Sequence, residues 1–143
     1  VEMITNPAVH EKLPDGSKAT ARQIGNGEQD MFGDVSIDAI PAQNTTEERM
    51  NYHPPGRDNG YVLTFGDFKV YISGDTEPTP EMLALEDIDL CFLCMNLPFK
   101  PTYVYPYHYR GQDGGTQDPE HFAELVGAAS EVRMGDWYAP GEL

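Results

Sequence analysis

Three polar residues of this sequence, His53, Asp75 and His108, are of types that bind divalent metal ions. Asp75 follows the apolar stretch KVYIS in a GDTE turn, and His108 follows the apolar stretch YVYP. His53 lies in a proline-rich loop that contains HPPG. Histidine nitrogens and carboxylate oxygens are the ligands that Zn²⁺ and similar ions take. The three residues therefore predict a metal centre built from side chains at or near strand ends.

The candidate ligands lie far apart in the sequence, whereas the ligands of a zinc finger are separated by about 2 to 5 residues. Only a folded sheet could bring them together. Each residue also has a structural explanation, because an aspartate after glycine often forms a turn or caps a helix. A loop histidine, likewise, is often exposed without a function. The residue types alone leave both explanations open.

The charge balance excludes several classes of partner. The chain has 143 residues, 9 Lys+Arg against 24 Asp+Glu, a formal net charge of −15 and a pI near 4.3. Such a charge opposes binding to the phosphate backbone of nucleic acids or to anionic lipid. An ordinary acidic protein and one adapted to high salt both fit this charge. With 39% hydrophobic residues, the chain is expected to pack a core and to form a single domain, 1–143.

The two cysteines, Cys91 and Cys94, lie in the apolar run DLCFLCM. Residues three apart on a strand point to opposite faces, which favours two buried thiols over a shared site. Metal or redox use of a CxxC pair is the alternative. Free thiols fit a reducing cytoplasm.

Strands and helices alternate along the sequence, which predicts an α/β fold. The long proline-rich segment 41–60 has no usable period, and a loop of this length is often functional. The expected elements are a strand over 35–40, a hairpin of 61–65 and 68–73 around Gly66-Asp67, a short helix that starts at Pro80 after Thr79, strands over 89–95 and 102–106, a helix from Pro119 to Gly127 capped by Asp118, and an edge strand over 131–134.

The two apolar strands over 89–95 and 102–106 resemble neighbours in a parallel sheet. A parallel crossover needs a dozen or more residues, usually with a helix, yet only 96–101 lie between them. Either the strands are antiparallel or a connecting helix is missing from this chain, and we favour the second explanation.

Three stretches, NGYVLTFGDFKVYISGDTEPTPEM, DIDLCFLCMNLPF and YVYPYHYRGQD, resemble the metallo-β-lactamase superfamily, in particular its ascorbate-lactonase-like branch of metal-dependent hydrolases. The resemblance runs from about Ile4 to Trp137. It implies a partial αββα sandwich with a metal site at one edge of two packed sheets. Asp75 would be the aspartate that bridges two metals, His108 the final histidine ligand and His53 an intermediate one.

The sequence departs from the family in two places. The family's His-x-His-x-Asp-His motif is absent and would precede ITNPAV, and the family's helix between DLCFLCM and YVYPYH has no counterpart near 96–101. The resemblance therefore implies an incomplete domain that lacks its N-terminal metal motif. With three ligands at most, this chain alone is expected to bind metal weakly and to hydrolyse poorly or not at all.

By resemblance, Asp75 and His108 are also catalytic and the substrate is a small molecule. Water bound to a divalent metal, zinc or manganese, held by these residues would attack a lactone, an ester or a phosphoester. Tyr109 and Arg110 would bind an anionic substrate or a developing oxyanion, unless they are only a solvated surface pair. The alternative is a non-catalytic acidic scaffold or interaction subunit. Half a sandwich exposes the apolar inner face of its sheet, so a homo-oligomer or a complementing chain is expected to cover it.

Overall fold

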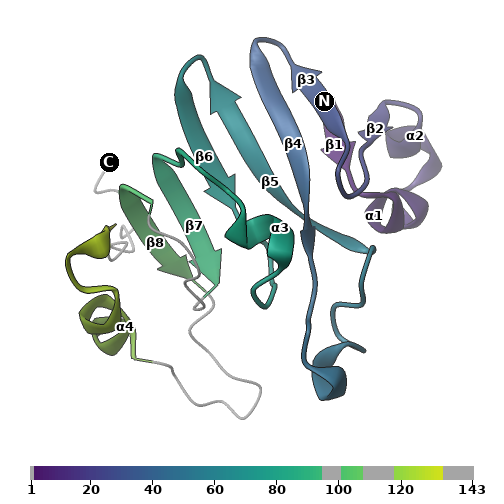
Figure 1. Ribbon diagram of the computed structural model, residues 1–143. Helices are drawn as coiled ribbons and strands as arrows, with labels where there is room; N and C mark the ends of the chain where they lie inside the picture. The colour runs from purple at the N-terminus through teal and green to yellow at the C-terminus, as the bar shows by residue number, and fades with distance from the viewer. Residues whose placement is uncertain (1, 95–100, 108–117, 134–143) are drawn as a thin grey trace, which may run out of the picture.

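The structure is a computed structural model that describes residues 2–94, 101–107 and 118–133 (Figure 1). These residues form a seven-stranded sheet of order β3-β4-β5-β6-β7-β8-β9 and a separate two-stranded sheet, β1-β2. The strands are β1 (Met3–Thr5), β2 (Ala21–Gln23), β3 (Gln29–Phe32), β4 (Val35–Ala42), β5 (Asp58–Phe65), β6 (Phe68–Ile72), β7 (Leu90–Cys94), β8 (Tyr103–Tyr107) and β9 (Glu131–Val132). The helices are α1 (Pro7–Lys12), α2 (Asp15–Lys18), α3 (Pro80–Leu83) and α4 (Pro119–Val126), with short 3₁₀ turns η1 (Glu47–Arg49) and η2 (Gly127–Ala129). The predicted α/β class is confirmed.

The seven-stranded sheet has an antiparallel half and a parallel half. Strands β3 to β6 pair antiparallel, and β6 to β9 pair parallel. The carboxyl ends of β6, β7 and β8 therefore meet at one edge, together with the amino end of β5 (Figure 1, lower edge). The parallel pairing of β7 with β8 is the predicted one, and the antiparallel alternative is wrong. Residues 95–100, where the connecting helix was expected to be missing, lie outside the described residues.

Local chemistry explains where several elements begin and end. Gly66, at φ 62°, makes the tight turn between β5 and β6. The Thr79 side chain accepts a hydrogen bond from the Met82 N–H and caps α3. The Asp118 side chain caps α4 in the same way, and Gly127 ends it at φ 56°. No helix in the described part of the chain is both long and apolar enough to cross a membrane.

The first face of the large sheet is covered by α3 and α4. Met82 of α3 and Phe122 of α4 pack on a buried cluster of this face, and α3 lies in front of the sheet in Figure 1. The sheet contributes Val62, Tyr71, Cys91, Leu93 and Val104 to the cluster. Both cysteines are buried and free, as the sequence predicted, and only Cys91 belongs to this cluster.

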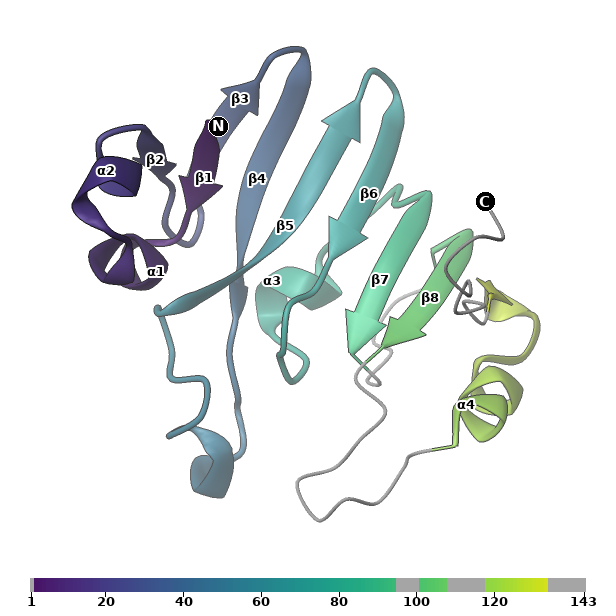
Figure 2. The ribbon, with the colours of Figure 1, turned by 180° about the vertical axis from the view of Figure 1, so that it is seen from behind.

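The second face of the sheet, seen in Figure 2, is also apolar. By register it carries Val35, Ile37, Ala39, Tyr61, Leu63, Phe65, Phe68, Val70, Ile72, Leu90, Phe92, Tyr103 and Tyr105. Ile4 and Ile24 pack against its β4–β5 portion. Phe65 and Phe68, at the hairpin tip, are 48% and 46% exposed, which marks a part of this face that the described residues leave uncovered.

Candidate metal centre

Two of the three predicted ligands meet at the carboxyl edge of the parallel strands. Asp75 follows β6, and His53 lies in the loop that enters β5 from the same edge. The His53 Nε2 atom lies 3.1 Å from Asp75 Oδ2. Their side chains are 27% and 43% exposed, so solvent reaches both. The structure thus brings these two residues together as predicted from the sequence.

The other nitrogen of His53 is held by a second carboxylate. His53 Nδ1 lies 2.9 Å from Asp58 Oδ2, and the guanidinium of Arg57 donates to the same aspartate. Burial acts to raise the pKa of Asp58, but the hydrogen bonds from Arg57 and His53 outweigh it and lower that pKa. An ionised Asp58 can only accept, so Nδ1 carries a proton, and Nε2 faces Asp75.

This donor set fits a divalent metal ion. A histidine that binds a metal usually donates its second N–H to a carboxylate, which is how Asp58 contacts His53. In a tetrahedral site with bonds of about 2 Å, neighbouring ligand atoms lie roughly 3.3 Å apart, close to the 3.1 Å between His53 Nε2 and Asp75 Oδ2. Among residues 2–94, 101–107 and 118–133, no three side chains of the metal-binding types converge on one point.

The remaining predicted site residues, His108, Tyr109 and Arg110, lie outside the described residues. Strand β8 ends at Tyr107, whose hydroxyl donates to the Gly74 carbonyl at 2.5 Å. The described part of β8 therefore reaches the edge that carries Asp75.

A buried glutamate, Glu77, anchors the loop that leads to His53. Glu77 Oε2 accepts from the Thr45 and Thr46 N–H groups at 2.8 and 2.6 Å, and from the Thr45 hydroxyl at 3.0 Å. Burial favours a higher pKa for Glu77, but these donors outweigh it and lower the pKa to about 2. Asn44, the residue before Thr45, donates its N–H to the His53 carbonyl at 2.8 Å. Glu77 therefore fixes the base of the His53 loop.

Replacing Glu77 by glutamine is expected to lower the free energy of unfolding at pH 7 by about 2 kcal/mol, because a buried carboxylate with charge-assisted hydrogen bonds is lost. Since the folded-state pKa lies below the ordinary 4.5, this stabilisation is complete above pH 4.5 and is lost as the pH falls toward about 2. Urea unfolding at pH 7, 4 and 3 should show that the difference in free energy of unfolding between the wild type and Glu77→Gln becomes smaller as the pH falls. The exposed Glu81→Gln is the control, and an equal gap at all three pH values would contradict the assignment.

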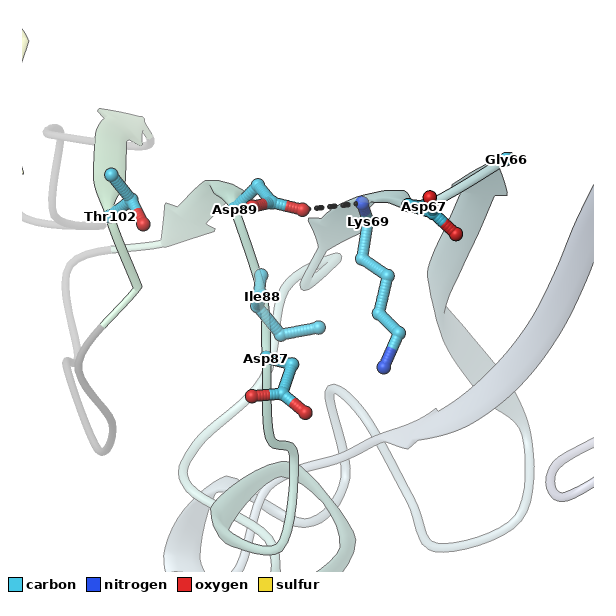
Figure 3. A pocket seen from close by; sticks show the side chains of 7 residues that line it. All are labelled: Gly66, Asp67, Lys69, Asp87, Ile88, Asp89 and Thr102. Atoms are coloured by element: carbon cyan, nitrogen blue, oxygen red, sulfur yellow. Dashed lines mark hydrogen bonds between the residues drawn. The ribbon is translucent and has the colours of Figure 1, made fainter.

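A separate hollow of about 600 Å³ lies at the opposite edge of the sheet (Figure 3). It is lined by the β5–β6 turn and by the residues that precede β7 and β8, with Asp67, Lys69, Asp87 and Asp89 among them. The Lys69 N–H donates to Asp89 Oδ2 at 2.8 Å. These residues lie at the amino ends of β6, β7 and β8, whereas Asp75 follows the carboxyl end of β6 and His53 lies beside it. The hollow is therefore not part of the candidate centre.

Sequence reasoning missed Asp58 and Glu77. Asp58 had a signal, since a carboxylate in the same loop as a candidate histidine can orient that histidine. Glu77 had none, because its partners Thr45 and Thr46 lie about thirty residues away and reach it only in the folded chain.

Comparisons with known proteins identify relatives that are named as metal-dependent hydrolases. The chain is 30% identical over 127 residues to a UPF0173 metal-dependent hydrolase of Thermococcus onnurineus, an alignment that covers 76% of this chain and 54% of the relative. A second UPF0173 metal-dependent hydrolase, from Thermococcus kodakarensis, is 28% identical over 134 residues and is covered to 58%. The chain thus spans little more than half the length of these curated relatives. No family model matches the chain.

Solved structures give the fold. The crystal structure of a protein from Parabacteroides distasonis, named as a metal-dependent hydrolase, has a TM-score of 0.78 and 38% identity over 93% of this chain and 63% of its own. The metallo-β-lactamase fold protein YhfI from Bacillus subtilis has a TM-score of 0.62 at 14% identity, which shows a shared fold alone. It is matched over 90% of this chain and 58% of its own.

Proposed function

We propose that the chain belongs to the metallo-β-lactamase superfamily and is part of a metal-dependent hydrolase whose ion is held by His53, Asp75 and His108. The observation that supports this best is the contact of His53 Nε2 with Asp75, with Asp58 on the other ring nitrogen. A histidine that one carboxylate orients toward a second carboxylate offers two of the ligands that a metal centre needs. The relatives and the solved structure named as metal-dependent hydrolases support the same class of chemistry.

In this proposal the residues of the chain have distinct tasks. Asp58 keeps the Nδ1 proton of His53 and so leaves Nε2 free to bind a cation. Asp75 supplies negative charge next to that nitrogen. A bound zinc or manganese ion would act as a Lewis acid and lower the pKa of a bound water. Tyr109 and Arg110 would hold the anionic part of a lactone, an ester or a phosphoester.

We further propose that this chain does not supply all the ligands. It spans 54% and 58% of the two curated hydrolases, and its sequence carries no His-x-His-x-Asp-His motif. The remaining ligands, and a crossover helix near 96–101, would come from a further segment or from a complementing chain. Chain 1–143, treated as one incomplete domain, should then bind metal weakly.

The apolar second face of the large sheet suggests that another protein surface covers it. A sheet that is apolar on both faces is normally covered on both. A second copy of the chain or a complementing chain would cover the exposed Phe65 and Phe68. The same face is what favours the alternative function, an acidic scaffold or interaction subunit without catalysis. The free thiols of Cys91 and Cys94 fit a cytoplasmic location for either function.

Titration of the chain with Mn²⁺, followed by the loss of the free-ion electron paramagnetic resonance signal, tests the proposed centre. We expect saturable binding of one ion with an affinity weaker than micromolar, and slow hydrolysis at most of ester, lactone and phosphoester probes. Displacement of the bound Mn²⁺ by Zn²⁺ would show that both ions use one site. Tight stoichiometric binding would contradict the incomplete site, and no binding would contradict the metal centre.

A further inference from the structure

The carboxyl ends of β6, β7 and β8 are joined by side-chain hydrogen bonds under the Asp75 turn. The Cys94 N–H donates to Ser73 Oγ at 3.1 Å, which links β7 to β6. Cys94 Sγ donates to the Thr76 carbonyl at 3.1 Å and accepts from the Thr76 N–H at 3.4 Å. The turn is therefore held from the β7 side on both flanks of Asp75.

Tyr107 extends this network across a whole strand. The register places Tyr107 beside Cys94 of β7, and β7 lies between β8 and β6. The Tyr107 hydroxyl nevertheless donates to the Gly74 carbonyl at 2.5 Å and lies 3.1 Å from Ser73 Oγ. A side chain of β8 is thus hydrogen-bonded to the segment that follows β6, across the intervening strand β7.

The acceptor of this bond is well placed to affect the candidate centre. The Gly74 carbonyl belongs to the peptide group that joins Gly74 to Asp75, so a donor on it restrains the orientation in which Asp75 leaves the strand. Gly74 has φ 67°, in the left-handed region that glycine adopts readily. Its carbonyl also accepts a hydrogen bond from the adjacent Ser73 Oγ at 2.8 Å, so Tyr107 is the donor that ties this carbonyl to β8. In the sequence, the residue after Tyr107 is His108.

We propose that Tyr107 is a positioning residue of the metal centre: its hydroxyl fixes the Gly74–Asp75 peptide relative to the end of β8, so that Asp75 is oriented before the ion binds. This inference rests on the proposed function and deepens it. Tyr107 needs no contact with the metal or the substrate in this role. Its removal should weaken metal binding while the fold is kept.

The variant that tests it is Tyr107→Phe, which deletes only the hydroxyl. Its matched control is Tyr105→Phe, on the same strand and the same face, where the ring stacks on Phe92. Mn²⁺ titration of the full chain should show affinity about tenfold to a hundredfold lower for Tyr107→Phe, as for other residues that orient a ligand, and less than twofold lower for the control.

A double-mutant cycle with Asp75→Asn separates positioning from general destabilisation. If Tyr107 acts through Asp75, Tyr107→Phe should have little further effect on Mn²⁺ affinity in the Asp75→Asn protein. Wild-type affinity in Tyr107→Phe, or an equal loss in both backgrounds, would overturn the positioning role and leave the metal centre standing.

Amide hydrogen exchange gives a readout that does not depend on metal. Tyr107→Phe should speed exchange at the Thr76 amide relative to Tyr105→Phe, because the turn around Asp75 is released. If the wild-type chain binds no Mn²⁺, the metal centre fails and this measurement alone decides whether Tyr107 holds the turn. Unchanged exchange there would overturn the inference.

Discussion

Replacing both Asp75 and His108 by alanine is expected to abolish Mn²⁺ binding by the chain while leaving its state of assembly unchanged. Loss of a residue that only orients a metal ligand already costs about tenfold to a hundredfold in affinity, so loss of two ligands should cost more than a hundredfold. His53 would remain, but with no neighbouring carboxylate at its Nε2 atom. Titration and light scattering on the same samples would measure both properties.

The matched control is the pair Asp67→Ala and His121→Ala, which removes the same residue types elsewhere. Asp67 lies in the β5–β6 turn at the opposite edge, and the His121 side chain is exposed on α4. Metal binding should survive these changes. Equal metal binding in both double variants, together with unchanged assembly, would favour the scaffold over the hydrolase.

Replacing Gly60 by alanine is expected to destabilise the fold by about 3 kcal/mol or more, because the added methyl group meets backbone that cannot move aside alone. A Cβ atom at Gly60 would lie 2.7 Å from the Ser73 carbonyl oxygen and 2.9 Å from that of Ile72. Ile72 is the last residue of β6, and Ser73 follows it two residues before Asp75. A shift that relieved the clash would therefore also displace the candidate ligand, and metal binding should weaken with stability.

Urea unfolding of Gly60→Ala beside Gly16→Ala would check this prediction. Gly16 lies in α2, and a Cβ atom there would meet no described residue within 4 Å apart from its chain neighbours and the backbone of its own helix. Its replacement should therefore be neutral or stabilising by up to about 1 kcal/mol. The contrast isolates the steric effect from the general effect of alanine on the unfolded chain. Similar unfolding midpoints for both variants would show that β6 moves aside without a loss of stability, and would contradict the prediction.

The elements predicted correctly are those with a local chemical signal. Gly66-Asp67 marked the hairpin, and proline after Thr79 and after Asp118 marked two helix starts. The first 34 residues hold β1, α1, α2, β2 and β3, which the sequence did not predict. Those elements are at most six residues long, too short for a period to emerge, although Asn6 before Pro7 does cap α1.

The candidate site was predictable to the extent that strand ends could be located. Asp75 follows a clear strand, and antiparallel pairing of β5 with β6 brings the loop that carries His53 to the same edge of the sheet. Asp58 and Glu77 act through contacts that span loops, and a linear pattern does not reveal such contacts. The predicted roles of His108, Tyr109 and Arg110 remain predictions, since these residues lie outside the described ranges.

The change from antiparallel to parallel pairing at β6 also sets an order of folding. Gly66 and Asp67 alone join β5 to its antiparallel partner β6, whereas residues 73–89 separate β6 from its parallel partner β7, and strands that are close in the sequence pair sooner. Asp58 begins this hairpin, and His53 and Asp75 lie in the segments that flank its open end. The segments that carry His53 and Asp75 should thus come together in the first phase of refolding, before the parallel strands pair.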